Sequence, residues 1–177
     1  YNAGSANTSG SQNVFVGRYA GAATTTGADN VSVGSGNFSS NTTGGSNTAV
    51  GKGALTANTT ASNNTAIGKA ALLSNTTGSE NTAVGFQALN TATTAANNTS
   101  VGHNALFNAT TGGNNTAVGK SAGENVTTGA ANAAFGYQAL DANTTANGNS
   151  AIGYTSMSAN TTGADNTALG AASLLSN

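Results

Sequence analysis

The stretch Asn47-Thr48-Ala49-Val50-Gly51 decides the fold, because the chain repeats this pattern every 17 residues. We number each repeat from its asparagine as position 1, so that the glycine stands at position 5. The spacing holds without insertion or deletion along all 177 residues. A strict short period is typical of a solenoid, in which each repeat forms one coil stacked on its neighbours.

Two positions of the repeat never vary. Position 1 is Asn13, Asn30, Asn47, Asn64, Asn81, Asn98, Asn115, Asn132, Asn149 and Asn166. Position 5 is Gly17, Gly34, Gly51, Gly68, Gly85, Gly102, Gly119, Gly136, Gly153 and Gly170. Stacking in register places identical side chains above one another, so we expect the asparagine amides to form a ladder along the axis. We expect the glycines at corners that need a positive φ or a close approach of two backbones.

The residues between these two positions predict a short strand, because β-branched residues recur there at two-residue spacing. We expect positions 2 and 4, such as Thr48 and Val50, to face the core, with the leucine of position 9 opposite them. Gly21 replaces that leucine in one coil, where Phe15 of position 3 is a possible filler although position 3 is expected to point outward. Adjacent threonines at positions 13 and 14 predict a second strand over positions 12 to 14, with one threonine column facing solvent.

The predicted fold is therefore an all-β parallel β-solenoid, or β-roll, of about ten 17-residue coils. It forms a single uncapped segment over residues 1–177, and we expect this segment to belong to a longer repeat array. Coils about 4.8 Å apart would build a rod of roughly 50 Å. The core is thin, with about three apolar side chains per coil to offset the ordering of a whole coil. We therefore expect the rod to associate with itself along a flat face.

Composition excludes several classes of protein. Charged residues make up 5% of the chain and the net charge is −1, whereas about 25% is usual. A chain this poor in Lys and Arg lacks the basic surface that nucleic acid requires. The absence of cysteine excludes disulfides and thiolate metal sites, and no apolar run reaches the roughly 20 residues of a membrane span.

The block Asn-Thr-Ala-Val-Gly-x-x-Ala-Leu-x-x-Asn-Thr-Thr-Gly resembles repeats of phage tail-fibre and tail-spike-like proteins. It is also similar to the Asn-Ser-Val-Ala-Ile-Gly repeats in the heads of trimeric autotransporter adhesins, whose repeats are shorter. The best matches are Asn47–Gly51, Asn64–Gly68, Asn81–Gly85 and Asn115–Gly119. The resemblance implies a left-handed β-roll, three chains packed side by side, and a location outside the cell or on a virion.

Position 6 is the candidate surface for recognition, because it holds all four basic residues, the single histidine and four of the nine aromatic residues. The stripe is Tyr1, Arg18, Lys52, Lys69, Phe86, His103, Lys120, Tyr137 and Tyr154. Cation and aromatic side chains after a corner can contact a saccharide, a cell surface or a neighbouring filament. An ordinary solvated corner is the alternative interpretation.

Sequons at position 12 are candidate glycan acceptors: Asn7, Asn41, Asn58, Asn75, Asn143 and Asn160. His103 has no second histidine or matching acid to complete a metal site or to act with as a base. No nucleophile stands with a base and an orienting partner, so we expect neither catalysis nor a cofactor.

We therefore expect a non-catalytic structural shaft of an extracellular fibre, from a phage tail fibre or a surface adhesin, that spaces other elements and makes weak surface contacts. One alternative is an ice-binding solenoid, for which the adjacent threonines of positions 13 and 14 are poorly placed because they face opposite sides. Another alternative is a filament of chains stacked end to end. The partner in the fibre readings is the chain itself, as a homotrimer or as such a filament.

Overall fold

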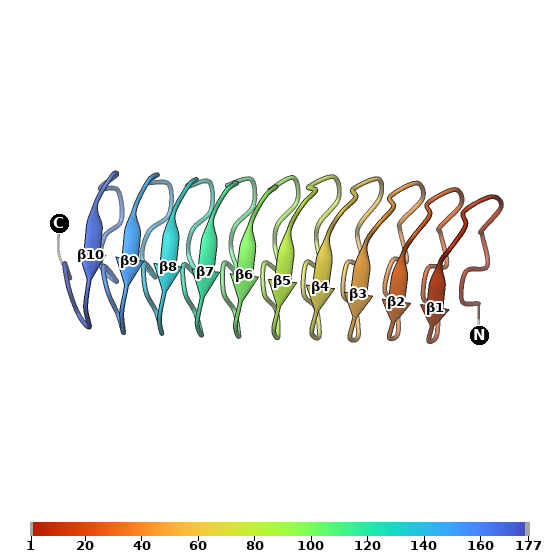
Figure 1. Cartoon of the computed structure of the whole chain (residues 1–177), viewed down its shortest axis with the longest axis horizontal. Coiled ribbons are helices and arrows are strands. Elements are labelled where there is room, and N and C mark those ends of the chain that lie inside the picture. The colour runs from red at the N-terminus through yellow and green to blue at the C-terminus, as the bar shows by residue number, and fades with distance from the viewer. Residues whose placement is uncertain (1, 176–177) are drawn as a thin grey trace.

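The computed structural model describes residues 2–175 and shows a rod of stacked coils, each coil contributing one short strand to a single sheet (Figure 1). The strands are β1 Val14–Val16, β2 Val31–Val33, β3 Thr48–Val50, β4 Thr65–Ile67, β5 Thr82–Val84, β6 Thr99–Val101, β7 Thr116–Val118, β8 Ala133–Phe135, β9 Ser150–Ile152 and β10 Thr167–Leu169. Neighbours in the sheet are neighbours in sequence, they pair in parallel, and partners are 17 residues apart, as Thr48 with Thr65. The predicted β-solenoid and its period are confirmed.

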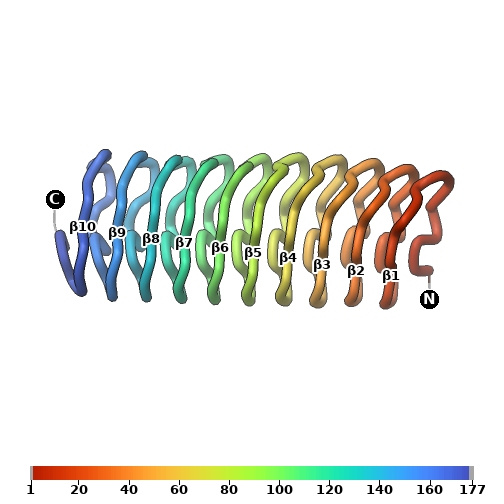
Figure 2. The backbone as a smooth tube through the Cα atoms, in the orientation of Figure 1, coloured from red at the N-terminus to blue at the C-terminus, as the bar shows by residue number. Residues whose placement is uncertain are grey.

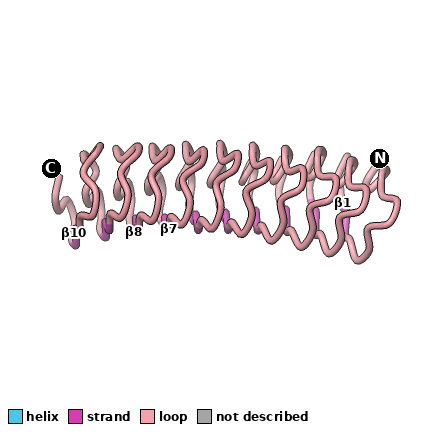
Figure 3. The backbone as a smooth tube through the Cα atoms, turned by 90° about the horizontal axis from the view of Figure 1, so that it is seen from above, coloured by secondary structure: helices cyan, strands magenta, loops and turns pink. Residues whose placement is uncertain are grey.

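The coil winds in a left-handed sense. In Figure 1 the strands face the viewer and run downward, while successive coils advance from the N-terminus at the right to the C-terminus at the left. The tube in Figure 2 follows the same path without interruption, and Figure 3 shows from above that all strands lie along one side of the rod. The outer surface of the sheet is therefore one long face.

The strand residue that faces the core is position 3, and the expectation that positions 2 and 4 point inward is wrong. Ala49, Ala83 and Ala117 of position 3 are fully buried, whereas Val50 of position 4 is only half-buried. The coil is narrow at the strand, so an alanine fills the space opposite Leu55 of position 9, which is also fully buried. Two-residue alternation shows that one set of side chains faces inward, but it does not show which set.

The predicted second strand is wrong as well. Positions 13 and 14 form a bend, position 12 has no regular structure, and the ten strands above are the only ones in residues 2–175. The main-chain N–H groups of Thr25 and Thr26 both donate to the carbonyl of Thr42, at 2.9 and 3.2 Å, which interrupts the alternation of a strand ladder. One threonine column faces solvent as expected, and it is the column of position 14, for example at Thr26.

Coils without the position 9 leucine are filled by a neighbouring position. Phe15 packs against the core, and a Cβ added to Gly21 would come within 2.6 Å of its Cδ1 atom. Phe15 is therefore the filler of that coil, and it points inward as all position 3 side chains do. In the coil of Gly123 the space is taken by Val126 and by Leu106 of the preceding coil, which lie 3.5 and 3.1 Å from where its Cβ would be.

The position 5 glycines are corners, as predicted. Gly51 has a φ of 118°, and a Cβ there would lie 2.7 Å from the carbonyl carbon of Gly68 in the next coil. A side chain at this position would meet backbone, which cannot move aside without breaking the coil spacing. Stacking therefore requires the glycine.

Candidate functional site: the outer sheet face and its edges

The position 1 asparagines form the predicted ladder, and their side chains link main chain to main chain. At position 1 of every coil from Asn30 to Asn166, the main-chain N–H of the asparagine donates to Oδ1 of the position 1 asparagine one coil earlier. The N–H of Asn47, for example, donates to Asn30 Oδ1 at 3.1 Å. The Nδ2 of Asn47 donates to the carbonyl of Ala61 at 2.9 Å, which closes the coil on itself. Asparagine supplies both the acceptor and the donor that these two bonds need.

A second column of asparagines lies inside the coil at position 12, where five of the six expected glycan acceptors are fully buried. They are Asn41, Asn58, Asn75, Asn143 and Asn160. Their Nδ2 atoms, which a glycan would occupy, donate to the carbonyl at position 15 at 2.8–3.1 Å. The expectation of surface acceptors is therefore wrong at these five. Asn7, in the first coil, is exposed, and its Nδ2 donates to the carbonyl of Gly10 at 2.9 Å.

The asparagine column of position 12 is interrupted where another residue replaces the asparagine. Asn58 donates from Nδ2 to Asn41 Oδ1 at 2.9 Å, and Asn75 donates to Asn58 Oδ1 at 3.0 Å. The next coil has Ala92 at this position, so Asn75 Oδ1 stays buried without a hydrogen-bond partner. The hydrogen bond between coils at position 1 is therefore required in every coil, whereas the side-chain bond between coils at position 12 is optional.

The position 6 side chains that the structure describes are exposed and lie above one another along one edge of the sheet; Tyr1 lies outside the described residues. The rings of Phe86 and His103 stack with centroids 5.1 Å apart, and those of Tyr137 and Tyr154 with centroids 5.2 Å apart. The ammonium of Lys69 lies 5.5 Å from the Phe86 ring centroid. Lys120 stands in the same way over Tyr137, at 5.7 Å.

This stacking decides which parts of the rings a ligand can reach. Saccharides bind to the faces of aromatic rings, and in this column the faces are turned toward the coils above and below. The rings of Phe86 and Tyr137 each have a lysine ammonium on one side and a second ring on the other. What remains outward is a line of ring edges, hydroxyls and cationic head groups, which suits polar and charged partners.

The outer face of the sheet carries an apolar column that the sequence reasoning placed inside. It consists of the position 4 residues Val16, Val33, Val50, Ile67, Val84, Val101, Val118, Phe135, Ile152 and Leu169. Ile67 in the middle of the rod is 40% exposed, and Ile152 is 44% exposed. Position 3, always small apart from Phe15, was the signal that could have shown which side is narrow. Val50, Val84, Val101 and Val118 of this column are half-buried, and the other six side chains are exposed. An apolar column of this length on an outer face is unusual for an isolated soluble chain.

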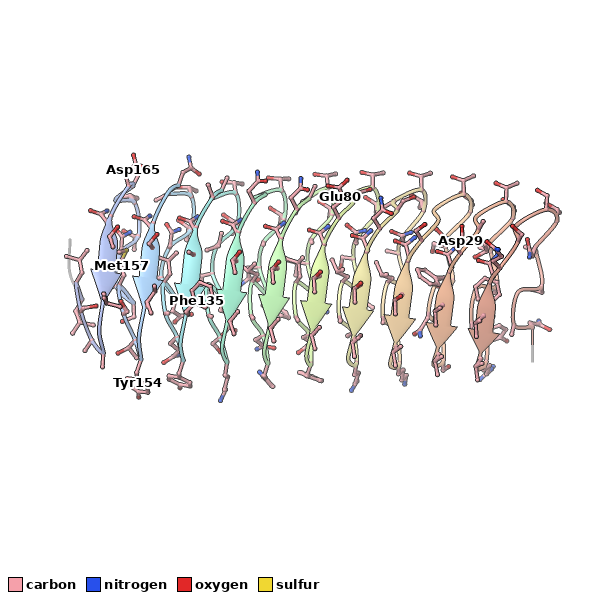
Figure 4. All side chains as sticks on the ribbon, in the orientation of Figure 1. Asp29, Glu80, Phe135, Tyr154, Met157 and Asp165 are labelled. Carbon is pink, nitrogen blue, oxygen red and sulfur yellow. The ribbon has the colours of Figure 1, made fainter. Side chains whose placement is uncertain are left out.

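The two long edges of this face differ in charge. Position 6 lies two residues after each strand and carries all the basic residues, while position 17 lies two residues before each strand and carries Asp29, Glu80 and Asp165. These three acids are exposed. Figure 4 shows Asp165 and Tyr154 at opposite ends of the strands. The remaining acids, Glu124 and Asp141, stand at position 10, away from both edges.

Glu124 and Asp141 lie one coil apart at the same position of the repeat. Burial raises the pKa of the Asp141 carboxyl above its ordinary value, and the negative charge of Glu124 raises it further. The amide of Asn104 donates to Glu124 Oε1 at 3.3 Å.

The position 13 threonines use their hydroxyls within the ladder. Thr59 Oγ1 donates to the carbonyl of Thr76 at 3.0 Å, and the same bond recurs in most coils. Of these two adjacent threonine columns, position 14 is the one that faces solvent. The two threonine columns therefore do not form one flat face.

Residues 2–175 contain no group of three or more histidine or acidic side chains that could hold a metal ion, no helix able to cross a membrane and no pocket. Comparison of the chain with known protein families, with characterised proteins and with solved structures gave no match.

Proposed function

We propose that this chain is the shaft of an extracellular fibre, built from copies that pack side by side through the outer face of the sheet. The observation that carries the proposal is the apolar column of position 4 on the outer face of the sheet, in which six of ten side chains are exposed and the other four are half-buried. No part of residues 2–175 packs over this column, because all strands lie on one side of the coil (Figure 3). A second copy offers the same column and is therefore a matching partner.

The face is large enough for a stable contact. Nine steps of ~4.8 Å make the sheet about 43 Å long, and the seven residues from position 17 to position 6 span roughly 20 Å. The resulting face of roughly 850 Å² per chain is comparable to the ~800 Å² that each partner contributes to a specific interface. Three copies around one axis, as the resemblance to adhesin heads implies, would bring all three columns together.

The mechanism is mechanical. Several main-chain bonds and one asparagine contact cross each gap between successive coils, so that a load along the rod is shared among the bonds of each gap. The shaft holds other elements at a fixed distance, and the exposed edge of position 6 adds weak contacts that gain strength by repetition. No step of this function requires catalysis.

The test places a charge in the middle of the apolar column. Val84→Lys should convert an assembled wild type into single chains of 16.8 kDa, as measured by light scattering on a size-exclusion column. Thr94→Lys, at the exposed position 14, adds the same charge elsewhere and should leave the assembly intact. Circular dichroism checks that both variants fold. A wild type that is already a single chain at all concentrations would refute the proposal.

A second candidate function is binding to ice. The observed orientation of the strands favours the outer face of the sheet as the ice-binding surface, in place of the threonines of positions 13 and 14. Positions 2 and 4 share the outer face, where five successive coils pair threonine with valine or isoleucine, from Thr48 with Val50 to Thr116 with Val118. Hydroxyls and methyls then recur every ~4.8 Å along the rod and ~7 Å across it. Thermal hysteresis that Thr82→Lys abolishes would support this function, and none in the wild type would remove it.

A further inference from the structure

We propose that the position 17 asparagines Asn63, Asn97 and Asn114 are acceptor sites for N-linked glycan. Each begins an Asn-Asn-Thr sequon, and all three are exposed at one edge of the sheet, whereas the sequons of position 12 have buried asparagines in five coils. The proposal goes beyond the function of a shaft and does not depend on how copies of the chain pack.

The side-chain amides of these three asparagines are free, although their main chain is anchored. The N–H of Asn97 donates to the carbonyl of Ser79 at 3.1 Å, and the N–H groups of Asn63 and Asn114 bond in the same way to the preceding coil. Neither Nδ2 nor Oδ1 of these asparagines has a partner among residues 2–175. Nδ2, the atom that a sugar would occupy, can therefore react without breaking a bond of the fold.

The threonine of each sequon lies on the same outer surface as its asparagine. Thr65, Thr99 and Thr116 stand at position 2, whose side chains share the outer face of the sheet with those of position 4. They are half-buried, and their hydroxyls make no hydrogen bond within the part of the chain that the structure describes. A transferase can thus contact the amide and the hydroxyl of one sequon from one side of the rod.

The other sequons lack either a free amide or a free hydroxyl. Those with a buried asparagine outside position 12 begin at Asn30, Asn37 and Asn98. Asn7 uses both ends of its amide, because Nδ2 donates to the carbonyl of Gly10 and Oδ1 accepts from its N–H, at 2.9 Å each. At position 11, Asn108 Nδ2 donates to Asn125 Oδ1 at 3.1 Å, and the hydroxyl of Thr127 in the Asn125 sequon donates to a carbonyl of the next coil at 3.0 Å.

The reaction is a glycosyl transfer to an amide nitrogen. Nδ2 attacks the anomeric carbon of a sugar that carries a diphosphate, so that a carbon–nitrogen bond forms while the bond from that carbon to the phosphate oxygen breaks. The diphosphate leaves with the electron pair, the nitrogen loses one proton, and nothing is oxidised or reduced. The diphosphate belongs to a nucleotide sugar or to a lipid-linked sugar, and both donors present the same reacting carbon.

Glycans at this edge are compatible with the coil spacing and with packing through the outer face. Asn97 and Asn114 belong to successive coils ~4.8 Å apart, and Asn63 lies two coils before Asn97. Position 17 stands at the rim of the outer face, and interface rims stay accessible to solvent. The glycans would add hydrophilic bulk to a chain of which only 5% is charged.

The test measures the intact mass of the folded chain after exposure to each donor. In one arm the purified chain is incubated with a nucleotide sugar and an N-glycosyltransferase that modifies a short Asn-Asn-Thr peptide. In the other arm it is secreted from cells whose oligosaccharyltransferase uses a lipid-linked donor. The mass should exceed 16.8 kDa in at least one arm, which identifies the donor, with tandem mass spectrometry placing sugar at position 17. A folded chain of 16.8 kDa in both arms, or sugar at position 7, 11 or 12 of the repeat instead, would overturn the proposal.

Two triple variants test the sites themselves, with circular dichroism as the check of folding. One replaces the asparagines, and position 17 tolerates the change because Gln12 stands there with a φ of 57°. Its substitutions are Asn63→Gln, Asn97→Gln and Asn114→Gln. The other keeps the asparagines and removes the sequon hydroxyls, as Val31 does at position 2. Its substitutions are Thr65→Val, Thr99→Val and Thr116→Val.

Both triple variants should lose the whole increase in mass. The matched control is Thr82→Val, since the residue two places before it is Glu80 and no position 17 sequon is removed. This control should gain the same mass as the wild type. Sugar that persists in either folded triple variant, or that disappears in the control, would overturn the assignment to position 17.

Discussion

The asparagine ladder can be tested at a single rung, with Asn81→Ala. In the wild type, Asn81 Nδ2 donates to the carbonyl of Ala95 at 2.8 Å, and the main-chain N–H of Asn98 donates to Asn81 Oδ1 at 3.0 Å. Ala95 and Asn98 are buried, so water cannot replace the lost partners without opening the coil. A buried group left without its partner costs about 1–3 kcal/mol. Two such groups predict a loss of about 2–6 kcal/mol in the free energy of unfolding.

Chemical denaturation measures the total effect, and hydrogen exchange at the Asn98 amide measures it locally. The control is Asn97→Ala, which removes the same side chain from the exposed position 17, where Ala131 is tolerated in another coil. We expect Asn97→Ala to cost only about 1 kcal/mol, because the side chain is exposed but its φ of 60° is a conformation that asparagine adopts more readily than alanine. If Asn81→Ala is as mild as this control, or leaves exchange at Asn98 unchanged, the ladder is not what makes position 1 invariant.

Three further predictions concern the core, the corners and pH. Leu89→Ala should cost about 2–5 kcal/mol on denaturation, because Leu89 is fully buried and its removal leaves a cavity; a smaller loss would mean that the coil collapses around it. Gly51→Ala should prevent stable folding, whereas Gly53→Ala, with a φ of 72° but nothing closer than 3.5 Å to its Cβ, should cost only about 1 kcal/mol; circular dichroism melting curves that coincide would contradict this difference. Because the folded state raises the pKa of Asp141, it holds that proton more tightly than the unfolded chain does, and stability falls as pH rises from 3.8 through the raised value. Asp141→Asn should therefore be more stable than the wild type at pH 7 and equal to it below about pH 4 in denaturation curves; a variant that is less stable at pH 7 would contradict the sign, and Glu124→Gln should show the same trend more weakly.

The features required for coil stacking could be predicted from the sequence, because stacking constrains the same position in every coil. The period, the amide ladder of Asn47 and its equivalents, and the corner at Gly51 follow from the requirement that one coil repeat on the next. The leucine of position 9 was also placed correctly in the core, at Leu55. These features depend on residue type and spacing alone.

Whether a given side chain points into the coil or out of it could not be predicted in the same way. Val50 is β-branched and alternates with its neighbours as a core strand residue does, yet it lies on the outer face because the coil is too narrow to hold it opposite Leu55. Asn58 has the sequence of a surface glycan site, yet it is buried because its amide closes the bend to Ala61. Interior width and bend geometry decide both cases, and a one-dimensional pattern does not contain them.

The side-by-side assembly is tested most directly by combining light scattering with small-angle X-ray scattering of the wild type. The account predicts a mass that is a whole multiple of 16.8 kDa, with a particle length still about 50 Å and a larger cross-section. A particle that lengthens as its mass grows would indicate stacking end to end and contradict lateral packing. A single rod of 16.8 kDa at every concentration would contradict the assembly altogether.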